Sequence, residues 1–115
     1  EFLSGRIDVM NHKEFSEVLE RQLDRCRNVL VFKSKEYDLE TGDRFHSFKV
    51  AAALQHLTPK QALCGMMCKH TVSVYDMVEA GEDYPLEKWD EKITDNINYL
   101  LLLRGLIEEE KSNGN

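Results

Sequence analysis

The chain has 115 residues, of which 42% are hydrophobic and 31% charged, a balance typical of one folded domain and unlike that of a disordered chain. Its formal net charge of −6 makes free nucleic acid and anionic membrane surfaces poor partners. No apolar run approaches the ~20 residues that a membrane-spanning helix needs.

Three cysteines and an N-terminus without an apolar segment indicate a reducing compartment. Residues 1–10 lack the hydrophobic core of a signal peptide, and an odd cysteine count does not suit a disulfide framework. We therefore expect a cytoplasmic protein. Cys64 and Cys68 stand four residues apart on a predicted helix, but a zinc site needs four ligands and Cys26 is distant in sequence. Burial of the thiols is the favoured interpretation over metal binding.

Apolar residues recur at helical spacing and predict four helices. The first begins near Asn11, where Asn11 and Glu14 form a pair typical of a capping box, and it ends within residues 33–37. The second is short, covers residues 44–54 and is capped by Asp43.

The third predicted helix has the clearest boundaries. Thr58 and Gln61 form a capping box around Pro59, which takes the first helical position. Gly81 stops this helix after Ala80. The last helix covers residues 86–110.

Three long helices, one short helix and no strand pattern predict an all-α fold, an antiparallel four-helix bundle. We assign residues 11–110 to a single helical domain, residues 111–115 to a polar tail, and residues 1–10 to a disordered or vector-derived segment. The last helix is apolar on nearly all sides, more than three neighbours in a small bundle can cover. We therefore expect a homodimer that buries the excess.

The last helix also carries polar residues among its leucines. Glu91, Asp95 and Asn98 fall at positions i, i+4 and i+7 and share one face. A carboxylate beside so many apolar residues is costly unless it is paired, bound to a ligand or hydrated. Asp95 and Asn98 therefore mark either a polar contact inside the bundle or a functional site.

A matching polar stripe of Lys69, Ser73 and Asp76 runs along the third helix, with His70 at its border with the apolar face. If the two stripes face each other, they bring together a cation, an imidazole, a hydroxyl, carboxylates and an amide. These groups suit a Mg²⁺–phosphate ligand, since Mg²⁺ prefers oxygen ligands and cations neutralise phosphate.

The same residues have a simpler interpretation. An interhelical ion pair from Lys69 to Asp95 or Glu91, beside a hydrogen-bonded Asn98, would fix the register of the helices without any ligand. From the residues alone, this interpretation is the favoured one.

A second cluster surrounds the start of the second helix. Lys35, Arg44 and Lys49 place positive charge near a helix N-terminus, which is a ready anion site, and Phe45 and Phe48 could stack on a base. For the aromatic residues a place in the core is favoured, whereas for Arg44 and Lys49 both interpretations stay open. The sequence contains no phosphate-cradling glycine loop and no nucleophile elbow.

Four segments, residues 35–37, 43–49, 62–70 and 95–99, together resemble a known group of proteins. In order and spacing they resemble small phage or prophage proteins of Gram-positive bacteria. Those are similar to the all-α nucleotide pyrophosphohydrolase superfamily, which includes MazG-like enzymes and dimeric dUTPases, and to domains linked to nucleotide modification in phages. The resemblance covers residues from about 12 to 108.

The resemblance implies a dimeric or tetrameric helical bundle, in a bacterium or a phage-infected host, that cleaves nucleoside triphosphates to monophosphates and pyrophosphate with Mg²⁺. Active members hold the metal with an E-E-x-x-E motif on one helix and an E-x-x-D motif on the next. Asp95 matches the final aspartate, and Tyr99 matches an aromatic residue commonly found four positions later. Lys92 stands where the E-x-x-D glutamate is expected, with Glu91 beside it, and the double-glutamate motif is absent.

These observations lead to one expected function and one alternative. The protein is expected to bind a nucleotide or a related phosphate-bearing small molecule and, if it is an enzyme, to be a Mg²⁺-dependent pyrophosphohydrolase without an organic cofactor. The alternative is a non-catalytic, phage-derived protein that sequesters a nucleotide signal or modulates a host protein. The catalytic candidates are His70 and Asp95, the Mg²⁺ candidates are Asp76, Glu91 and Asp95, and the ligand-binding candidates are Lys35, Arg44, Lys49, Lys69, Ser73, Asn98 and Tyr99.

Overall fold

The computed structural model describes residues 8–37 and 42–114, with residues 32–37 described by their backbone alone. It contains the helices α1 (His12–Tyr37), α2 (His46–Gln55), α3 (Pro59–Ala80) and α4 (Leu86–Ser112). No strand occurs in this part of the chain, so the predicted all-α fold with three long helices and one short helix is confirmed. Over the same residues, none of the helices combines the length and the apolar character needed to cross a membrane.

Capping boxes start two of the long helices, as predicted. At α1 the Asn11 backbone N–H donates to Glu14 Oε1 at 3.0 Å, and the Glu14 N–H donates to Asn11 Oδ1 at 2.8 Å. At α3 the same reciprocal pair joins Thr58 and Gln61, at 2.9 and 3.2 Å. Each box satisfies two backbone donors that the first turn of a helix leaves without a partner.

Two helix ends differ from the prediction. Helix α2 begins at His46 rather than directly after Asp43, because the Asp43 carboxylate instead accepts from the Phe45 N–H, at 2.9 Å, in the turn before the helix. Helix α4 continues to Ser112, two residues into the segment assigned to the polar tail. The Asn113 N–H closes its last turn on the carbonyls of Glu109 and Glu110.

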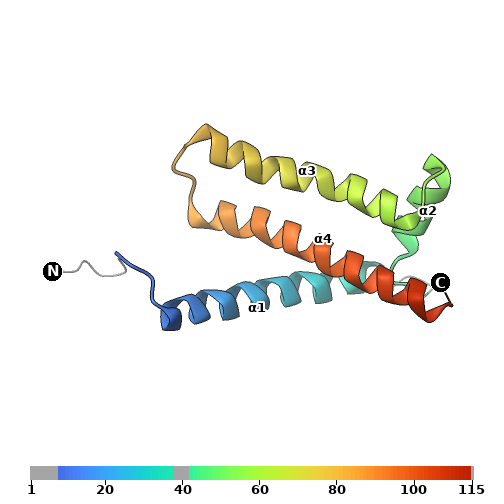
Figure 1. The fold of residues 1–115 in the computed structure, drawn as a ribbon, viewed down its shortest axis with the longest axis horizontal. Coiled ribbons are helices and arrows are strands. Elements are labelled where there is room, and N and C mark those ends of the chain that lie inside the picture. Colours follow the sequence, from blue (N-terminus) through green and yellow to red (C-terminus); the bar gives the residue numbers. More distant parts are fainter. Residues whose placement is uncertain (1–7, 38–41, 115) are drawn as a thin grey trace.

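Helix α4 lies between α1 and α3 (Figure 1). It packs against both helices and is antiparallel to α3, while α2 lies across the end of the α3–α4 hairpin and packs on α3. Among the described residues, α1 and α3 do not pack on each other. The bundle is therefore open along one side of α4, between the two helices that flank it.

The apolar core is concentrated where α2, α3 and α4 meet. Phe48, Leu63 and Leu106 are buried there, and Leu63 is fully enclosed. Helix α1 is attached to α4 more lightly. Its Cys26 is buried, and its Gln22 side chain donates to the buried Thr94 hydroxyl at 2.8 Å.

The burial predicted for the thiols holds for Cys26 but is wrong for Cys64 and Cys68, which are exposed. Helix α3 turns the face of Leu63 and Met66 to its neighbours, and the two cysteines lie off that face.

Several large apolar side chains remain exposed on α1 and α4. On α1, Phe15 is 57% exposed, and on α4 Leu100 is 55% exposed. Leu19, Leu23, Ile93 and Leu101 are exposed as well. The single chain does not cover these surfaces, so the homodimer stays a prediction that they motivate.

Candidate functional site

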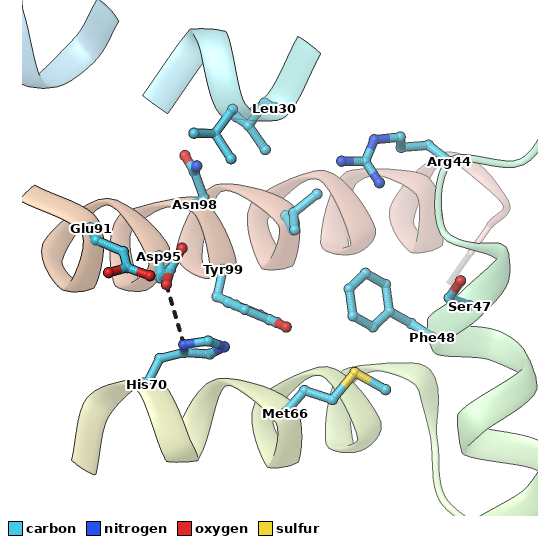
Figure 2. Close-up of a pocket in the computed structure, with 12 residues that line it drawn as sticks. Leu30, Arg44, Ser47, Phe48, Met66, His70, Glu91, Asp95, Asn98 and Tyr99 are labelled. Atoms are coloured by element: carbon cyan, nitrogen blue, oxygen red, sulfur yellow. Dashed lines mark ion pairs between the residues drawn. The ribbon is translucent and has the colours of Figure 1, made fainter. Parts of the chain in front are cut away.

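A pocket of about 480 Å³ opens on α4, in the gap between α1 and α3 (Figure 2). Helix α4 forms its floor, α1 and α3 contribute its sides, and the segment that begins α2 contributes Arg44, Ser47 and Phe48. The pocket exists because α1 and α3 both pack on α4 without meeting each other. Its lining residues are Val29, Leu30, Arg44, Ser47, Phe48, Met66, His70, Glu91, Asp95, Asn98, Tyr99 and Leu102.

The floor of the pocket follows one face of α4. Glu91, Asp95, Asn98, Tyr99 and Leu102 all line it, and their spacing keeps them on adjoining helical positions. From residue 91 to residue 102, the floor extends about 16 Å at ~1.5 Å per residue. The pocket is thus elongated along α4, and its chemistry changes from one end to the other.

One end of the pocket is acidic. Glu91 and Asp95 stand one turn apart, and Asp95 Oδ2 lies 3.5 Å from Nδ1 of His70 on α3. The imidazole also packs against the Tyr99 ring, with centroids 5.0 Å apart and planes inclined by 30°. His70 is therefore held between a carboxylate and an aromatic ring, and when protonated it forms an ion pair with Asp95.

The other end of the pocket is set by the turn before α2. The Phe45 ring lies against α4 at Gly105, so close that a Cβ added to this glycine would be 3.0 Å from the ring. Gly105 is ten residues beyond Asp95, about 15 Å along the axis of α4. Arg44 thus enters the pocket from the end opposite to Asp95 (Figure 2).

Lys49 fastens this turn and does not line the pocket. Its Nζ donates to Asp43 Oδ2 at 2.7 Å and lies 3.0 Å from Glu109 Oε1. The hydrogen bond from Lys49 holds the pKa of Asp43 below its ordinary value, with help from the Phe45 N–H. The hydrogen bonds to Asp43 and Glu109 raise the pKa of Lys49. For Lys49, the structural role left open by the sequence is the one that the structure shows.

Among the described lining residues, the middle of the pocket is apolar apart from the Asn98 amide and the Tyr99 hydroxyl. Asn98 is 4% exposed, and neither its Oδ1 nor its Nδ2 has a hydrogen-bond partner among the described residues. It is the only residue in the described part of the chain with buried side-chain polar atoms in this state. Figure 2 shows the side chain extending from α4 toward Leu30 of α1, while Tyr99 extends toward α3.

Asn96, two residues earlier, shows the opposite. Its Nδ2 donates to the carbonyls of His70 and Lys92 at 2.9 and 2.8 Å, and its Oδ1 accepts from the Thr71 hydroxyl at 3.0 Å. This amide joins α4 to the backbone of α3 beside His70. The role of Asn96 could not be predicted from the sequence, because an asparagine beside other polar residues carries no signal of such a contact.

Six of the candidate residues come together in the pocket: Arg44, His70, Glu91, Asp95, Asn98 and Tyr99. The polar stripe of α3 does not. Lys69 and Asp76 are exposed, and the Ser73 hydroxyl donates to the Lys69 carbonyl of its own helix. The side chain of Lys35 lies outside the described residues.

The alternative of a register-fixing ion pair is not what the structure contains. Within residues 8–31 and 42–114, no ion pair joins Lys69 to Asp95 or to Glu91, and Asp95 instead faces His70. Helix α3 packs on α4 through Leu63, Met66 and His70, which turns Lys69 outward. His70, which the sequence placed at the border of the two faces, therefore occupies the position that the polar stripe was expected to fill.

Glu91 and Asp95 are the pocket residues suited to Mg²⁺. Mg²⁺ is commonly held by one or two carboxylates, with substrate phosphates and water completing its shell, so this pair fits an ion that arrives with a phosphate ligand. Asp76 does not line the pocket. Nowhere in the described chain do three or more His, Cys, Asp or Glu side chains gather as a metal site.

No protein-family model matches the chain, and neither a curated protein nor a solved structure matches it.

Proposed function

We infer that the protein binds a nucleotide or a related phosphate compound in the pocket on α4. The observation that carries this inference is the convergence of Arg44, His70, Glu91, Asp95, Asn98 and Tyr99 on one pocket. Glu91, Asp95, Asn98 and Tyr99 share one face of α4, whereas Arg44 comes from the segment before α2 and His70 from α3, and sequence spacing does not require these two to meet the others. A pocket of about 480 Å³ with an apolar middle and a few polar groups is of the size and kind that small molecules use.

The acidic end suits a phosphate group that carries Mg²⁺. Two carboxylates would repel a bare phosphate, but with Mg²⁺ between them the same carboxylates become ligands. Glu91 and Asp95 would hold the ion, which would neutralise phosphate charge. His70, held by Asp95 and Tyr99, stands where it can donate to a phosphate oxygen or orient a water molecule. The resemblance to MazG-like proteins also supports Asp95 as a metal ligand and Tyr99 as part of the site.

The enzymatic form of this proposal is pyrophosphohydrolysis of a nucleoside triphosphate. Positioning and electrostatic stabilisation would then supply most of the rate gain, as in other phosphoryl-transfer enzymes. The test is a screen of the purified protein against the common nucleoside triphosphates and dUTP, with Mg²⁺ or Mn²⁺. Pyrophosphate release that disappears in Asp95→Ala supports hydrolysis. Release no greater than that of the variant for every substrate removes the enzymatic form.

A binding protein without turnover is the second candidate. It is favoured by the carboxylate count, because Glu91 and Asp95 are the only carboxylates among the described residues that line the pocket, and Asp76 lies outside it. Such a protein would sequester a nucleotide signal or use the nucleotide to modulate a host protein. A ligand at 100 times its Kd should stabilise the fold by about 2.7 kcal/mol while remaining chemically intact. Thermal unfolding followed by chromatography of the recovered nucleotide tests both parts.

A homodimer belongs to the same proposal. The exposed side chains of Phe15, Leu100 and Leu101 give apolar surface that a second copy would cover. Sedimentation equilibrium should give twice the chain mass of 13.4 kDa. Introducing charge with Leu100→Glu should return the monomer mass if α4 takes part in the contact.

A further inference from the structure

The feature that calls for a partner is the amide of Asn98. Its side chain is 4% exposed and lies in the pocket floor, and neither of its polar atoms has a hydrogen-bond partner within the described chain. Buried amides are almost always hydrogen-bonded, because leaving a buried donor or acceptor without a partner costs about 1–3 kcal/mol. Such a group in a pocket is typical of a site that a ligand completes.

The surroundings of Asn98 restrict what that ligand can be. Leu30 faces Asn98 from α1, while Phe48 and Tyr99, with ring centroids 6.4 Å apart in an edge-to-face arrangement, line the side of the pocket toward α3. An apolar lining that includes two aromatic rings suits the ring of a base. The amide offers one donor and one acceptor side by side, so a ring that satisfies both must present an acceptor next to a donor on one edge.

We propose that Asn98 is the residue that recognises the base of the bound nucleotide, through a two-point hydrogen bond to an edge of the ring. This inference rests on the proposed function, and it names the residue and the chemical group that the pocket reads. Asparagine makes the same two-point contact with the N6 and N7 edge of adenine in protein–DNA complexes. The amide can rotate by half a turn and exchange its donor and acceptor. Asn98 can therefore pair with more than one base, and the shape of the surrounding pocket determines which base is bound.

The positions along α4 set the orientation of the ligand. Asn98 lies one turn beyond Asp95, on the side away from Glu91. A base paired with Asn98 therefore occupies the apolar half of the pocket, bounded by Phe48 and Leu102, and its phosphates extend toward Glu91 and Asp95. Arg44 enters from the base end, where a guanidinium can lie over the face of a ring.

The test separates recognition of the base from recognition of the phosphates. Isothermal titration with Mg²⁺ present gives the affinity of the wild-type protein for each nucleoside triphosphate and for inorganic pyrophosphate. Asn98→Leu keeps the number and branching of the side-chain heavy atoms and removes both hydrogen bonds. We expect its affinity for the triphosphate that the wild type binds tightest to fall about 10- to 100-fold, the loss typical of a two-point contact, while its affinity for Mg²⁺–pyrophosphate is unchanged.

Thermal unfolding of the unliganded variant shows whether a loss of affinity comes from a destabilised fold. Because Asn98→Leu removes a buried amide that has no partner, it should leave the thermal midpoint of the unliganded protein unchanged or raised. A variant that is stable and loses triphosphate but keeps pyrophosphate supports the inference. An unchanged triphosphate affinity overturns it and leaves the proposed function standing. A wild-type protein that binds neither probe overturns the proposed function, and the base-reading role falls with it.

Discussion

Asn96 and Asn98 stand two residues apart on α4, and they serve two different regions of the molecule. Asn96 faces α3, and both polar atoms of its amide have hydrogen-bond partners. Two of its three hydrogen bonds go to residues of α3, and the third goes to a carbonyl of its own helix. Asn98 faces the gap toward α1, is buried where Asn96 is half-buried, and has no hydrogen-bond partner among the described residues. Burial alone therefore does not determine the role of a polar residue. What matters is whether its hydrogen bonds are made inside the chain.

The same contrast extends to the helices. The α3–α4 contact is closed by the core of Phe48, Leu63 and Leu106 and by the Asn96 hydrogen bonds. The α1–α4 contact contains the buried Cys26, the Gln22–Thr94 hydrogen bond and an ion pair between Arg25 and Asp90 at 3.4 Å, and α1 does not reach α3 in the described residues. The α3 side of α4 is thus tightly packed, whereas the α1 side leaves room for a ligand.

The largest expected effect comes from breaking the closed side. Asn96→Leu removes three hydrogen bonds and leaves the Thr71 hydroxyl without its side-chain partner, so it should lower the free energy of unfolding by about 1–3 kcal/mol. Urea denaturation followed by circular dichroism measures this. The matched variant Asn98→Leu should show no loss or a gain. Equal losses in the two variants would mean that Asn98 has partners in the unliganded protein, contrary to the comparison.

Two glycines give a smaller test of how the pocket end is built. Gly65 on α3 has open space around it, so Gly65→Ala should raise stability by up to ~1 kcal/mol through helix propensity. Gly105→Ala carries the same propensity gain, but the new Cβ would be 3.0 Å from the Phe45 ring. We expect its gain to be smaller or reversed, because the ring must move. Thermal unfolding of both variants measures the difference.

Movement of the Phe45 ring should also change the shape of the pocket. The ring belongs to the turn that carries Arg44, so Gly105→Ala should weaken nucleotide binding, whereas Gly65→Ala should leave it unchanged. If the two alanine variants bind nucleotide equally well, the seat of Phe45 on Gly105 does not control the pocket.

The smallest effect concerns the ion pairs of Lys49. Its side chain is 38% exposed, so Lys49→Met should cost less than about 1 kcal/mol. The pKa of Asp43 is held below its ordinary 3.8, so its contribution is present above that pH and is lost as the pH falls through the lowered pKa. The pKa of Lys49 is raised above 10.5, so its contribution is complete below that pH and is lost as the pH rises through the raised pKa.

Unfolding measured from pH 3 to pH 11 checks this assignment. The difference between the wild type and Lys49→Met should be largest between about pH 4 and pH 10 and should shrink at both extremes. A difference that stays constant across the whole range would show that the ion pairs to Asp43 and Glu109 do not act through charge.

The fold was predictable from local signals. The Asn11–Glu14 and Thr58–Gln61 pairs predict helix starts from side chains only three residues apart, and the structure contains both capping boxes. The stop at Gly81 follows in the same way, because its backbone takes the left-handed conformation with φ of 66°. These features depend on neighbours in sequence, so a single chain is sufficient to reveal them.

The site was predictable only in part, because it depends on how each helix is rotated. Asp95 and Asn98 were identifiable as polar residues in an apolar helix. Whether α3 would present Lys69 or His70 to them could not be read from sequence, since adjacent positions on a helix differ in direction by ~100°. The packing of Leu63 and Met66 decides the question in favour of His70.

The most direct test of the pocket as a nucleotide site compares two aspartates. Asp95 lines the pocket and faces His70, whereas Asp76 is exposed and does not line it. Both can be replaced by asparagine, which removes the same charge and keeps the shape. Titration with the tightest-binding nucleoside triphosphate in Mg²⁺ should show that Asp95→Asn weakens the affinity by about tenfold or more, a loss of ~1.4 kcal/mol or more of binding free energy. The affinity of Asp76→Asn should be unchanged. A wild-type protein that binds no triphosphate, or two variants that lose affinity equally, would contradict the assignment.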